Sequence, residues 1–490
     1  MKKTVYILAC LAAVSCEAFL DERPQSDLTR PDTQTSDQVS AYATLSEAQS
    51  ELNGAYALFK TDIYEAENFI IGDVMADNCY VGGDGVAEEQ FGNVALTATN
   101  SLVSLIWSQY YALTGSATNV IENVKLMDAS VIGADDRARL IAEAKFIRAW
   151  AYFDIVRLWG AAPMTLQLIP SITADNIDAW YPVMYPARTS EEEIYAQILD
   201  DLSDETIAGL ESRSNGAFSA TKGAAYGLKA KVLATMGPKT ERDYAAVVAC
   251  CDKVAEEGYA LVDRFEDLWT LDGKFSSESI FELYFSDAAE AHNWAYWVLL
   301  TDMSGSVTVS WRRYCTPTQD LVAKFDKEKD TRYAASIYWA KVPYETFWPA
   351  DNYPLAYKIR QKESDIILLR YADILLLKAE ALVEMGRPQE AMPLVNAVRR
   401  RAGIGELSLS LPQDEARLAV ENERQLELLL EGHRWFDLVR NDRWEAVMKT
   451  VHDKNGNLRF PEGIPAFRRN LPLPQGQIDI NERLIQNEGY

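Results

Sequence analysis

The sequence predicts a mainly α-helical protein in which tetratricopeptide-like helical hairpins stack side by side. Residues 368–403 form the clearest hairpin, because two helical patterns meet there at a turn that runs from Gly386 to Pro388. A unit of about 34 residues with such a turn is typical of tetratricopeptide repeats. At least three further helix pairs precede it, and stacking is needed because one unit cannot bury its own apolar face. The hydrophobic content of 48% is typical of a globular chain.

The hairpin of residues 368–403 carries its own start and stop signals. Gly386 can adopt the left-handed conformation that ends a helix, and Pro388 suits the first turn of the next helix. Three arginines then favour the negative end of the second helix before Gly403 closes it. In the first helix two sets of side chains lie at helical spacing on opposite sides, Arg370, Asp373, Glu380 and Glu384 on one and Tyr371, Leu375, Ala379 and Leu382 on the other.

The composition argues against several classes of function. The formal net charge is −25, whereas nucleic acids and anionic membrane surfaces are bound by clustered cations. Only three histidines are present and the cysteines form no C-x-x-C pair, so we expect neither a metal nor a cofactor. No G-x-S-x-G, H-E-x-x-H or P-loop motif occurs, so we predict no catalytic residue.

Residues 1–15 are predicted to be a lipoprotein signal peptide. A cationic start precedes an apolar run of about ten residues, which is too short to span a bilayer. Small residues then lead to Cys16, and this box resembles a bacterial lipoprotein signal in which the cysteine thiol is acylated. Such boxes more often carry Leu at the position of Ala13, so ordinary cleavage to a secreted protein is the alternative. Residues 16–43 are rich in Pro, Ser, Thr, Asp and Gln, which is typical of an extended tether.

Residues 44–258 are predicted to form an N-terminal helical region. Apolar stripes predict six helices, the first capped by Ser46 and the fourth by a capping box that begins at Ser190. Residues 72–100 are expected to be a loop, and residues 160–189 an irregular connection. The six helices are expected at residues 44–62, 102–127, 136–159, 190–210, 221–236 and 243–257.

Residues 259–367 differ from their surroundings and are predicted to be a loop-rich, ligand-binding insert. They are rich in aromatic residues and lack sustained helical periodicity, with a strand expected at residues 280–285. Residues 368–490 then complete the helical scaffold as a C-terminal region. Beyond the hairpin we expect a helix at 414–431 that continues or restarts at 432–440, a β-hairpin at 451–460 and an irregular tail at 472–490.

A series of sequence blocks in a fixed order covers nearly the whole chain. They are CEAFLDERPQSDLT (16–29), NGAY (53–56), GDVMADN (72–78), residues 107–120, AEAKFIRAWAYFDIVRLWGAAP (142–163), SIFE (279–282), Asp330-x-Arg332, the hairpin at 370–403, ERQLELLLEGHRWFDLVR (423–440) and residues 471–490. With these blocks the chain resembles the SusD/RagB family of outer-membrane nutrient-binding lipoproteins of Bacteroidetes. The acidic residues Glu17, Asp21 and Glu22 are also similar to the surface-export signal of such lipoproteins.

The resemblance implies a SusD-like α/α superhelix that supports a loop-rich ligand face, with minor β-hairpins. Proteins of this family are lipid-anchored at the cell surface in the outer membrane, here through Cys16. They capture oligosaccharides such as starch fragments, deliver them to a SusC-like TonB-dependent transporter and act as its lid. One branch, similar to RagB, captures peptides instead. A secreted glycoside hydrolase and a scaffold that binds only proteins are further alternatives.

Clustered aromatic residues in the insert are the leading candidates for ligand contacts. Five of the twelve tryptophans fall within residues 290–350, where even spacing would place about one or two. Aromatic faces complement the weakly positive C–H groups of sugars, and neighbouring polar side chains can bind the hydroxyls. The alternative is that individual rings fill the core under long loops. The predicted ligand-binding residues of the insert are Trp294, Tyr296, Trp297, Trp311, Arg312, Arg313 and Tyr314.

The early loop at residues 73–84 is the second candidate for ligand binding. Asp77, Asn78 and Tyr80 are suitable sugar contacts, and the family commonly binds with an early loop and the middle segment. The alternative is a surface turn held by side-chain hydrogen bonds to the backbone.

Three carboxylates on one helical face, Glu423, Glu427 and Glu431, could in principle do acid–base chemistry. Arg424, Arg434 and Arg440 are near in the sequence, and the resemblance to the SusD/RagB family implies that this block is part of the scaffold, so we expect internal ion pairs instead. A glycan-binding function without enzymatic activity is therefore the leading prediction.

Overall fold

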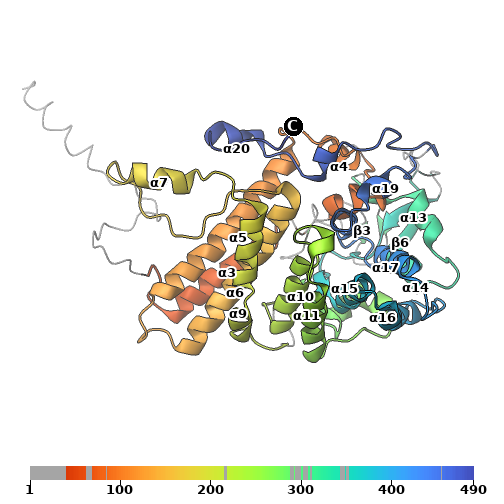
Figure 1. Cartoon of the computed structure of the whole chain (residues 1–490), viewed down its shortest axis with the longest axis horizontal. Coiled ribbons are helices and arrows are strands. Elements are labelled where there is room, and N and C mark those ends of the chain that lie inside the picture. Colours follow the sequence, from red (N-terminus) through yellow and green to blue (C-terminus); the bar gives the residue numbers. More distant parts are fainter. Residues whose placement is uncertain are drawn as a thin grey trace, which may run out of the picture. The chain divides into compact units, whose positions relative to one another are not determined.

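Helices dominate the structure, which confirms the mainly α-helical fold class (Figure 1). The computed structural model describes residues 40–61, 64, 69–83, 85–213, 218–286, 292, 300–301, 307–308, 312–342, 348, 352–453 and 455–490. The predicted signal peptide, Cys16 and most of the predicted tether lie outside these residues.

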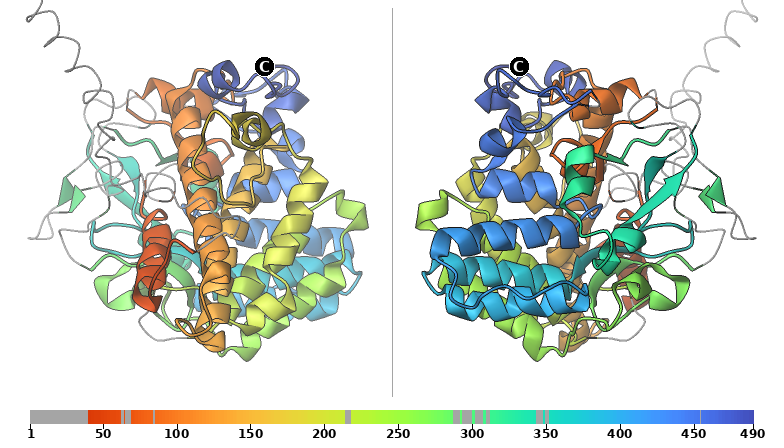
Figure 2. Two further views of the ribbon diagram at one scale, coloured as in Figure 1. Left: turned by 90° about the vertical axis from the view of Figure 1, so that its left-hand side faces the viewer. Right: turned by 90° about the vertical axis from the view of Figure 1, so that its right-hand side faces the viewer.

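The N-terminal region is organised around two long neighbouring helices, α5 (Ser101–Leu126) and α6 (Ala134–Trp159), each of 26 residues. They lie side by side in Figures 1 and 2. Helix α3 (Leu45–Ala57) packs against both, and α8 (Glu191–Asp201) packs against α6. Asn100 sets the start of α5, because its side-chain oxygen accepts hydrogen bonds from the first free N–H groups of the helix.

The predicted caps are confirmed at one helix and wrong at another. At α8 the Ser190 hydroxyl accepts from the Glu193 N–H at 3.2 Å, and the Glu193 carboxylate accepts from the Ser190 N–H at 3.1 Å. At α3 the cap is Thr44, whose hydroxyl accepts from the Glu47 N–H at 3.1 Å. Ser46 already lies inside the first turn, where its hydroxyl is not placed to cap the helix.

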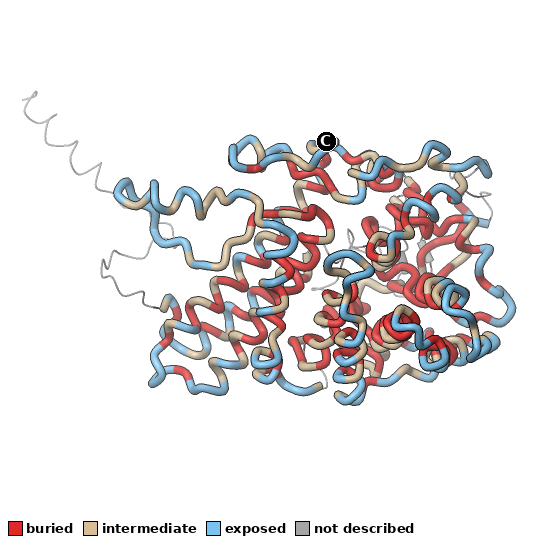
Figure 3. Tube along the Cα trace, in the orientation of Figure 1, coloured by how far each residue is buried: buried red, intermediate tan, exposed pale blue. Residues whose placement is uncertain are grey.

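The stacking of helical pairs is confirmed. Helices α10 (Lys222–Leu233), α11 (Tyr244–Glu256), α15 (Tyr371–Glu384), α16 (Pro388–Arg401) and α17 (Gln413–Glu427) each contact the next in this order. The right-hand view of Figure 2 shows the last three, cyan to blue, lying side by side. Buried residues run along these helices in Figure 3, so the apolar face of each pair is covered by its neighbour.

The turn between α15 and α16 has the predicted geometry. Gly386 has a φ of +73°, and Gly403 has a φ of +79° after the end of α16. Helix α15 is buried on nearly all sides, including Asp373 and Glu380, because both carboxylates are paired with cations. The polar side of this helix therefore faces the interior.

Two segments expected to be irregular contain short helices. Residues 72–100 contain α4 (Val86–Gly92). The π-helical turn η2 (Ile70–Val74) overlaps the first residues of the same segment. Within residues 160–189 lies α7 (Ile177–Met184). Gly72 in η2 lies against the backbone of Gly432, where a Cβ atom would meet main-chain atoms at 2.1 Å, so only glycine fits.

Four two-stranded antiparallel sheets complete the described fold. The predicted strand at residues 280–285 is β2, which pairs with β8 immediately before α15, so the intervening chain leaves and returns to the scaffold at one place. The predicted hairpin at 451–460 is reduced to one bridge, between His452 and Leu458. The pairs are β1 (Cys79–Tyr80) with β5 (Thr316–Pro317), β2 (Ser279–Leu283) with β8 (Ile366–Arg370), β3 (Leu300–Thr301) with β4 (Val307–Thr308), and β6 (Ile337–Ala340) with β7 (Tyr353–Ala356).

The remaining described helices are short. They are α9 (Asp204–Ala208), η3 (Lys239–Glu241), η4 (Phe265–Trp269), η5 (Leu271–Gly273), α13 (Gln319–Lys324), α14 (Thr331–Ser336), α18 (Arg434–Arg440), α19 (Trp444–Met448), η6 (Ala466–Arg469) and α20 (Gln475–Ile480).

Candidate ligand-binding site

A set of half-buried aromatic rings, here named the ring platform, consists of Tyr333, Trp339 and Trp348. Trp339 Nε1 donates to the Tyr333 hydroxyl at 2.7 Å, and the two indoles meet edge to face with centroids 5.2 Å apart. Trp348 Nε1 donates to the carbonyl of Pro317 in β5 at 3.1 Å. Both indole N–H groups are thus satisfied by the protein, and the partly exposed ring surfaces remain free for an apolar contact.

The opposite side of β6 also carries rings. Tyr338 and Tyr357 are half-buried with centroids 5.2 Å apart, and the Arg360 guanidinium lies 4.1 Å from the centroid of Tyr357. Successive side chains of a strand point to opposite faces, so β6 presents Tyr338 on one face and Trp339 on the other. The insert therefore offers partly exposed aromatic surface on both faces of this strand.

The insert residues chosen from the sequence divide into three groups. Arg313 and Tyr314 are buried, and Arg312 is half-buried. The other four, Trp294, Tyr296, Trp297 and Trp311, lie outside the described residues and stay predictions. The rings of the platform belong to the same aromatic-rich segment, and the count of tryptophans there was the signal that pointed to them.

The early loop and the middle segment lie next to each other, joined by the β1–β5 pair. The Gly82 N–H donates to the Arg313 carbonyl at 3.0 Å. A Cβ atom on Gly82 would lie 2.7 Å from that carbonyl and 2.8 Å from the Tyr353 hydroxyl. Arg313 itself has a φ of +40°. The close approach of the two segments thus depends on glycine at position 82.

Asp77 and Asn78 occupy the interior, contrary to the expectation of open sugar contacts. Asp77 accepts from Arg434 Nε at 2.7 Å and Nη2 at 3.0 Å. Burial opposes ionisation of Asp77, but Arg434 outweighs it and lowers the pKa of the carboxyl to about 2. The Asn78 amide donates to Asp73 and accepts from Gln425, so a polar side chain in a buried loop is satisfied internally.

Tyr80 is buried but lines a cavity of about 400 Å³. Its hydroxyl donates to the His452 carbonyl at 2.9 Å. The Arg459 guanidinium lies 5.4 Å from the Tyr80 ring and 5.2 Å from that of Phe460. Burial raises the pKa of Tyr80 to about 12, so the hydroxyl is neutral at physiological pH.

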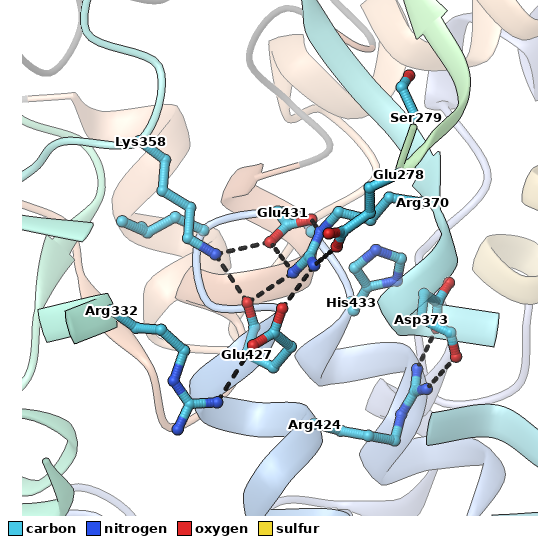
Figure 4. Close-up of polar contacts among 12 residues, drawn as sticks. Glu278, Ser279, Arg332, Lys358, Arg370, Asp373, Arg424, Glu427, Glu431 and His433 are labelled. Carbon is cyan, nitrogen blue, oxygen red and sulfur yellow. Dashed lines mark hydrogen bonds and ion pairs between the residues drawn. The ribbon is translucent and has the colours of Figure 1, made fainter. Parts of the chain in front are cut away.

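The three carboxylates Glu423, Glu427 and Glu431 are buried in a network of ion pairs, which confirms the predicted ion pairing. Figure 4 shows the part of this network around Glu427 and Glu431. Arg370 contacts Glu427 at 2.5 Å and Glu431 at 2.6 Å. Lys358 donates to Glu431 at 2.6 Å. The remaining contacts are Arg332 with Glu423 and Glu427, Arg399 with Glu423, and Arg401 with Glu427.

The neighbouring cations lower the pKa of two of these glutamates. Burial alone would raise the pKa of Glu427, but Arg401 and Arg370 outweigh it and hold the pKa well below its usual range. Arg370 and Lys358 likewise outweigh burial at Glu431 and lower its pKa. A carboxylate that is ionised, buried and paired is poorly suited to donate a proton to a surface ligand.

The cations that pair with these glutamates are not those expected from the same segment. Arg424 contacts Asp373 and Asp437, Arg434 contacts Asp77, and Arg440 contacts Glu380 and Asp437. Their place around the glutamates is taken by Arg332, Lys358 and Arg370, which lie 57 or more positions away in sequence, and by Arg399 and Arg401, which lie 24 and 26 positions away. The block Asp330-x-Arg332 was one sequence signal that could have pointed to one of these cations.

The part of the chain that the structure describes contains no group of three or more His, Cys, Asp or Glu side chains that could hold a metal ion. Within the same residues, no helix is both long enough and apolar enough to cross a membrane.

Two family models match the chain and together span about three quarters of it. One, described as starch-binding and associating with the outer membrane, matches residues 18–233. The other, described as the SusD family, matches residues 341–490. Among relatives, SusD-like protein P38 of Formosa agariphila is 27% identical, with 99% of this chain and 98% of that protein covered. Starch-binding protein SusD of Bacteroides thetaiotaomicron is 22% identical, with 71% and 72% covered.

Solved structures share the fold. Surface glycan-binding protein A from Bacteroides uniformis superposes with a TM-score of 0.76 at 20% identity, covering 91% of this chain and 99% of that one. The protein of the same name from Bacteroides thetaiotaomicron, in complex with laminarihexaose, gives a TM-score of 0.74 at 21% identity, covering 91% and 100%.

Proposed function

The chain belongs to the SusD family, and from this premise we propose that it is a glycan-binding protein of the cell surface. It captures an oligosaccharide on the ring platform and delivers it to a SusC-like TonB-dependent outer-membrane transporter, over which it acts as a lid. Cys16 carries the lipid that anchors it in the outer membrane. The protein binds its ligand and does not cleave it.

The observation that carries this proposal is the ring platform itself. Trp339 and Trp348 are half-buried and held at a fixed angle by hydrogen bonds through their indole N–H groups. A preset pair of rings loses little conformational entropy when a sugar stacks on it. Other proteins of this fold support the choice of ligand, because one of them is described as binding laminarin and another was solved with laminarihexaose.

The buried glutamates support binding without catalysis. Glu423, Glu427 and Glu431 are each paired with cations in the interior, so their role is to hold the insert to the scaffold. The contacts Trp294, Tyr296, Trp297 and Trp311, which lie outside the described residues, stay predictions from the sequence. Arg312 is the neighbouring polar residue that we assign to the sugar hydroxyls.

The test is titration calorimetry of Trp339→Ala with laminarihexaose and maltohexaose. We expect the affinity for the preferred glycan to fall by about tenfold or more, since losing a central aromatic contact costs about 1.4 kcal/mol or more. The matched control is Tyr181→Ala, which removes an exposed ring from α7, outside the insert, and should leave the affinity unchanged.

Three results would contradict the proposal. The first is equal affinity for the wild type and Trp339→Ala while the fold is intact by circular dichroism. The second is binding of a peptide mixture but of no glycan, which would favour the peptide-capturing alternative. The third is release of reducing sugar from a glycan, which would favour the hydrolase.

A further inference from the structure

A second cavity has a volume of about 340 Å³. Its lining residues come from 156–242 and 435–470, so it shares no residue with the ring platform. It is formed by the end of α6, the start of α8, the connection between α10 and α11, helix α18 and the residues that close η6. Its volume is within the range of small-ligand sites, about 300–1,000 Å³.

Positive charge distinguishes this cavity from the rest of the molecule. The chain has a net charge of −25, yet the cavity is lined by five cationic side chains and only two carboxylates. We call it the cationic cavity. The cations are Arg157, Lys239, Arg242, Arg440 and Arg469, and the carboxylates are Glu191 and Asp442.

Three of these cations already have carboxylate partners. Arg157 pairs with Asp154, Lys239 contacts Glu384 at 3.0 Å, and Arg440 pairs with Glu380 and Asp437. These three side chains line the cavity, but their paired carboxylates offset most of their positive charge. Arg157 is held especially firmly, because its guanidinium lies between the rings of Phe153 and Phe436 at 4.1 and 4.0 Å.

Arg242 carries a positive charge that no carboxylate neutralises by direct contact among the described residues. Its guanidinium donates to the backbone carbonyls of Thr235, Met236, Gly237 and Arg440 at 2.7–3.2 Å. Burial is the main cause that lowers the pKa of Arg242, and repulsion from Arg440 adds to it. The surroundings therefore disfavour the charged form of this guanidinium. Arg242 therefore contributes a fixed positive field, whereas its N–H groups are already used.

Arg469 is the cation whose donors remain available. Its side chain is exposed and makes no hydrogen bond or ion pair with the described part of the chain. Asn470, the next residue, lines the same cavity with its side-chain amide, which lies 2.9 Å from where a Cβ of Gly160 would be. A guanidinium and an amide that line one cavity can bind a carboxylate and a hydroxyl of one ligand.

The cationic cavity continues into a wider hollow of about 770 Å³. Asp442, Arg469 and Asn470 line both. The hollow adds the rings of Trp444 and Phe467, the Asn487 amide and two carboxylates, Glu445 and Glu488. The Phe467 ring meets Tyr490 edge to face at 5.0 Å. Such a mixture suits sugar rings and their hydroxyls, while the positive charge stays at one end.

We propose that the cationic cavity binds an acidic sugar, a uronic acid residue of a glycan, whose neighbouring sugars lie in the adjoining hollow. Arg469 donates to the carboxylate, Arg242 supplies a fixed positive field and Asn470 contacts a hydroxyl. The inference rests on the proposed function only in that the ligand is a saccharide. It adds a second site and an acidic ligand class to the neutral contacts of the ring platform.

The test is calorimetry with trigalacturonate and with the same trisaccharide after reduction of its carboxyl groups. We expect the acidic form to bind about tenfold more tightly at low salt, since charge-assisted hydrogen bonds are roughly twice as strong as neutral ones. Arg469→Gln should remove that difference, and Asp442→Asn should increase the affinity of the acidic form about twofold. Asn tolerates the φ of +55° at position 442, so this variant is expected to fold.

Two control variants separate this inference from the proposed function. Arg400→Gln removes an exposed cation elsewhere, on α16, and should change nothing. Trp339→Ala should lower the affinity for neutral glycans by about tenfold or more and leave trigalacturonate binding intact. If neutral glycans bind but the acidic and reduced trisaccharides bind equally, the inference fails alone; if no saccharide binds at all, both fail.

The remaining outcomes also decide the matter. Binding of inorganic sulfate or phosphate with no saccharide would mean an inorganic anion site only and would overturn the proposal. Tight binding of an acidic peptide in place of trigalacturonate would overturn it as well, as would unchanged affinity in Arg469→Gln.

Discussion

The C-terminal scaffold and the insert place their side chains in opposite ways. In the scaffold, Glu427, Glu431 and Asp373 are almost fully buried, although carboxylates are rarely buried unless they are paired. In the insert, Trp339 and Trp348 are left half-exposed, although large rings contribute most to a core when they are covered.

The two regions differ in how their polar groups are satisfied. Each of these buried carboxylates has at least one cation within hydrogen-bond distance, so its charge is neutralised by an ion pair inside the protein. The rings of the platform have their indole N–H groups satisfied and are packed against the core on one part of their surface, while another part stays accessible. The paired carboxylates therefore stabilise the scaffold, and the accessible part of the rings carries the proposed binding.

The largest effect is expected from Arg370→Met, which removes the central cation of the network. Arg370 is 1% exposed and contacts Glu278, Glu427 and Glu431. Breaking a buried ion pair by removing one partner costs about 3–5 kcal/mol, because the remaining charge is buried without compensation. Urea unfolding followed by circular dichroism should show this loss in the free energy of unfolding.

The control for Arg370→Met is Arg387→Met. Arg387 pairs with Glu390 on the surface, where solvent and salt screen the charges and such pairs contribute little to stability. Similar unfolding midpoints for the two variants would contradict the claim that the buried charges of the scaffold contribute more to stability than exposed surface charges.

A smaller, pH-dependent effect is expected from Asp77→Asn. The pKa of Asp77 is about 2 in the folded chain and about 3.9 when unfolded, so folding is favoured by the ionised form. The resulting stability is fully present above pH 4 and is lost as the pH falls through about 2. We expect the variant to be less stable by on the order of 2 kcal/mol at pH 6, with the difference shrinking by pH 3.

Urea unfolding of both proteins at pH 6, 4 and 3 measures this effect. Glu390→Gln, an exposed change, serves as the reference whose difference from the wild type should stay small at every pH. A constant difference between Asp77→Asn and the wild type across the series would show that the ionisation of Asp77 is not linked to folding.

Local features of the fold could be predicted from the sequence. The α15–α16 hairpin and the capping box at Ser190 depend on residues within a few positions of one another, so spacing and residue type were sufficient. Short helices such as α4 were missed because seven residues hold too few apolar positions to show a period.

The partners of buried charges could not be predicted in the same way. Spacing predicted that Glu423, Glu427 and Glu431 share one helical face, but α17 ends at Glu427 and Glu431 lies in the turn before α18. Their partners Arg332 and Arg370 reach them from 57 to 95 positions away. Asp77 was expected in an open loop for a related reason, since its partner Arg434 lies 357 positions further along. Periodicity carries no information on contacts between residues so far apart in the sequence. The insert, by contrast, could be identified because its aromatic residues are concentrated in a single stretch of the chain.

The smallest effect is expected from Tyr80→Phe. This variant tests whether the early loop is a structural part of the scaffold or a part of the ligand-binding surface. The Tyr80 hydroxyl donates to the His452 carbonyl, and the residue is 3% exposed. Losing this one hydrogen bond should lower the free energy of unfolding by about 0.5–1.5 kcal/mol. Affinity for the glycan bound by the wild type should stay within about twofold, because the hydroxyl is already used inside the protein. If affinity falls tenfold at unchanged stability, the 400 Å³ cavity beside Tyr80 is part of the ligand site, and the early loop belongs with the insert.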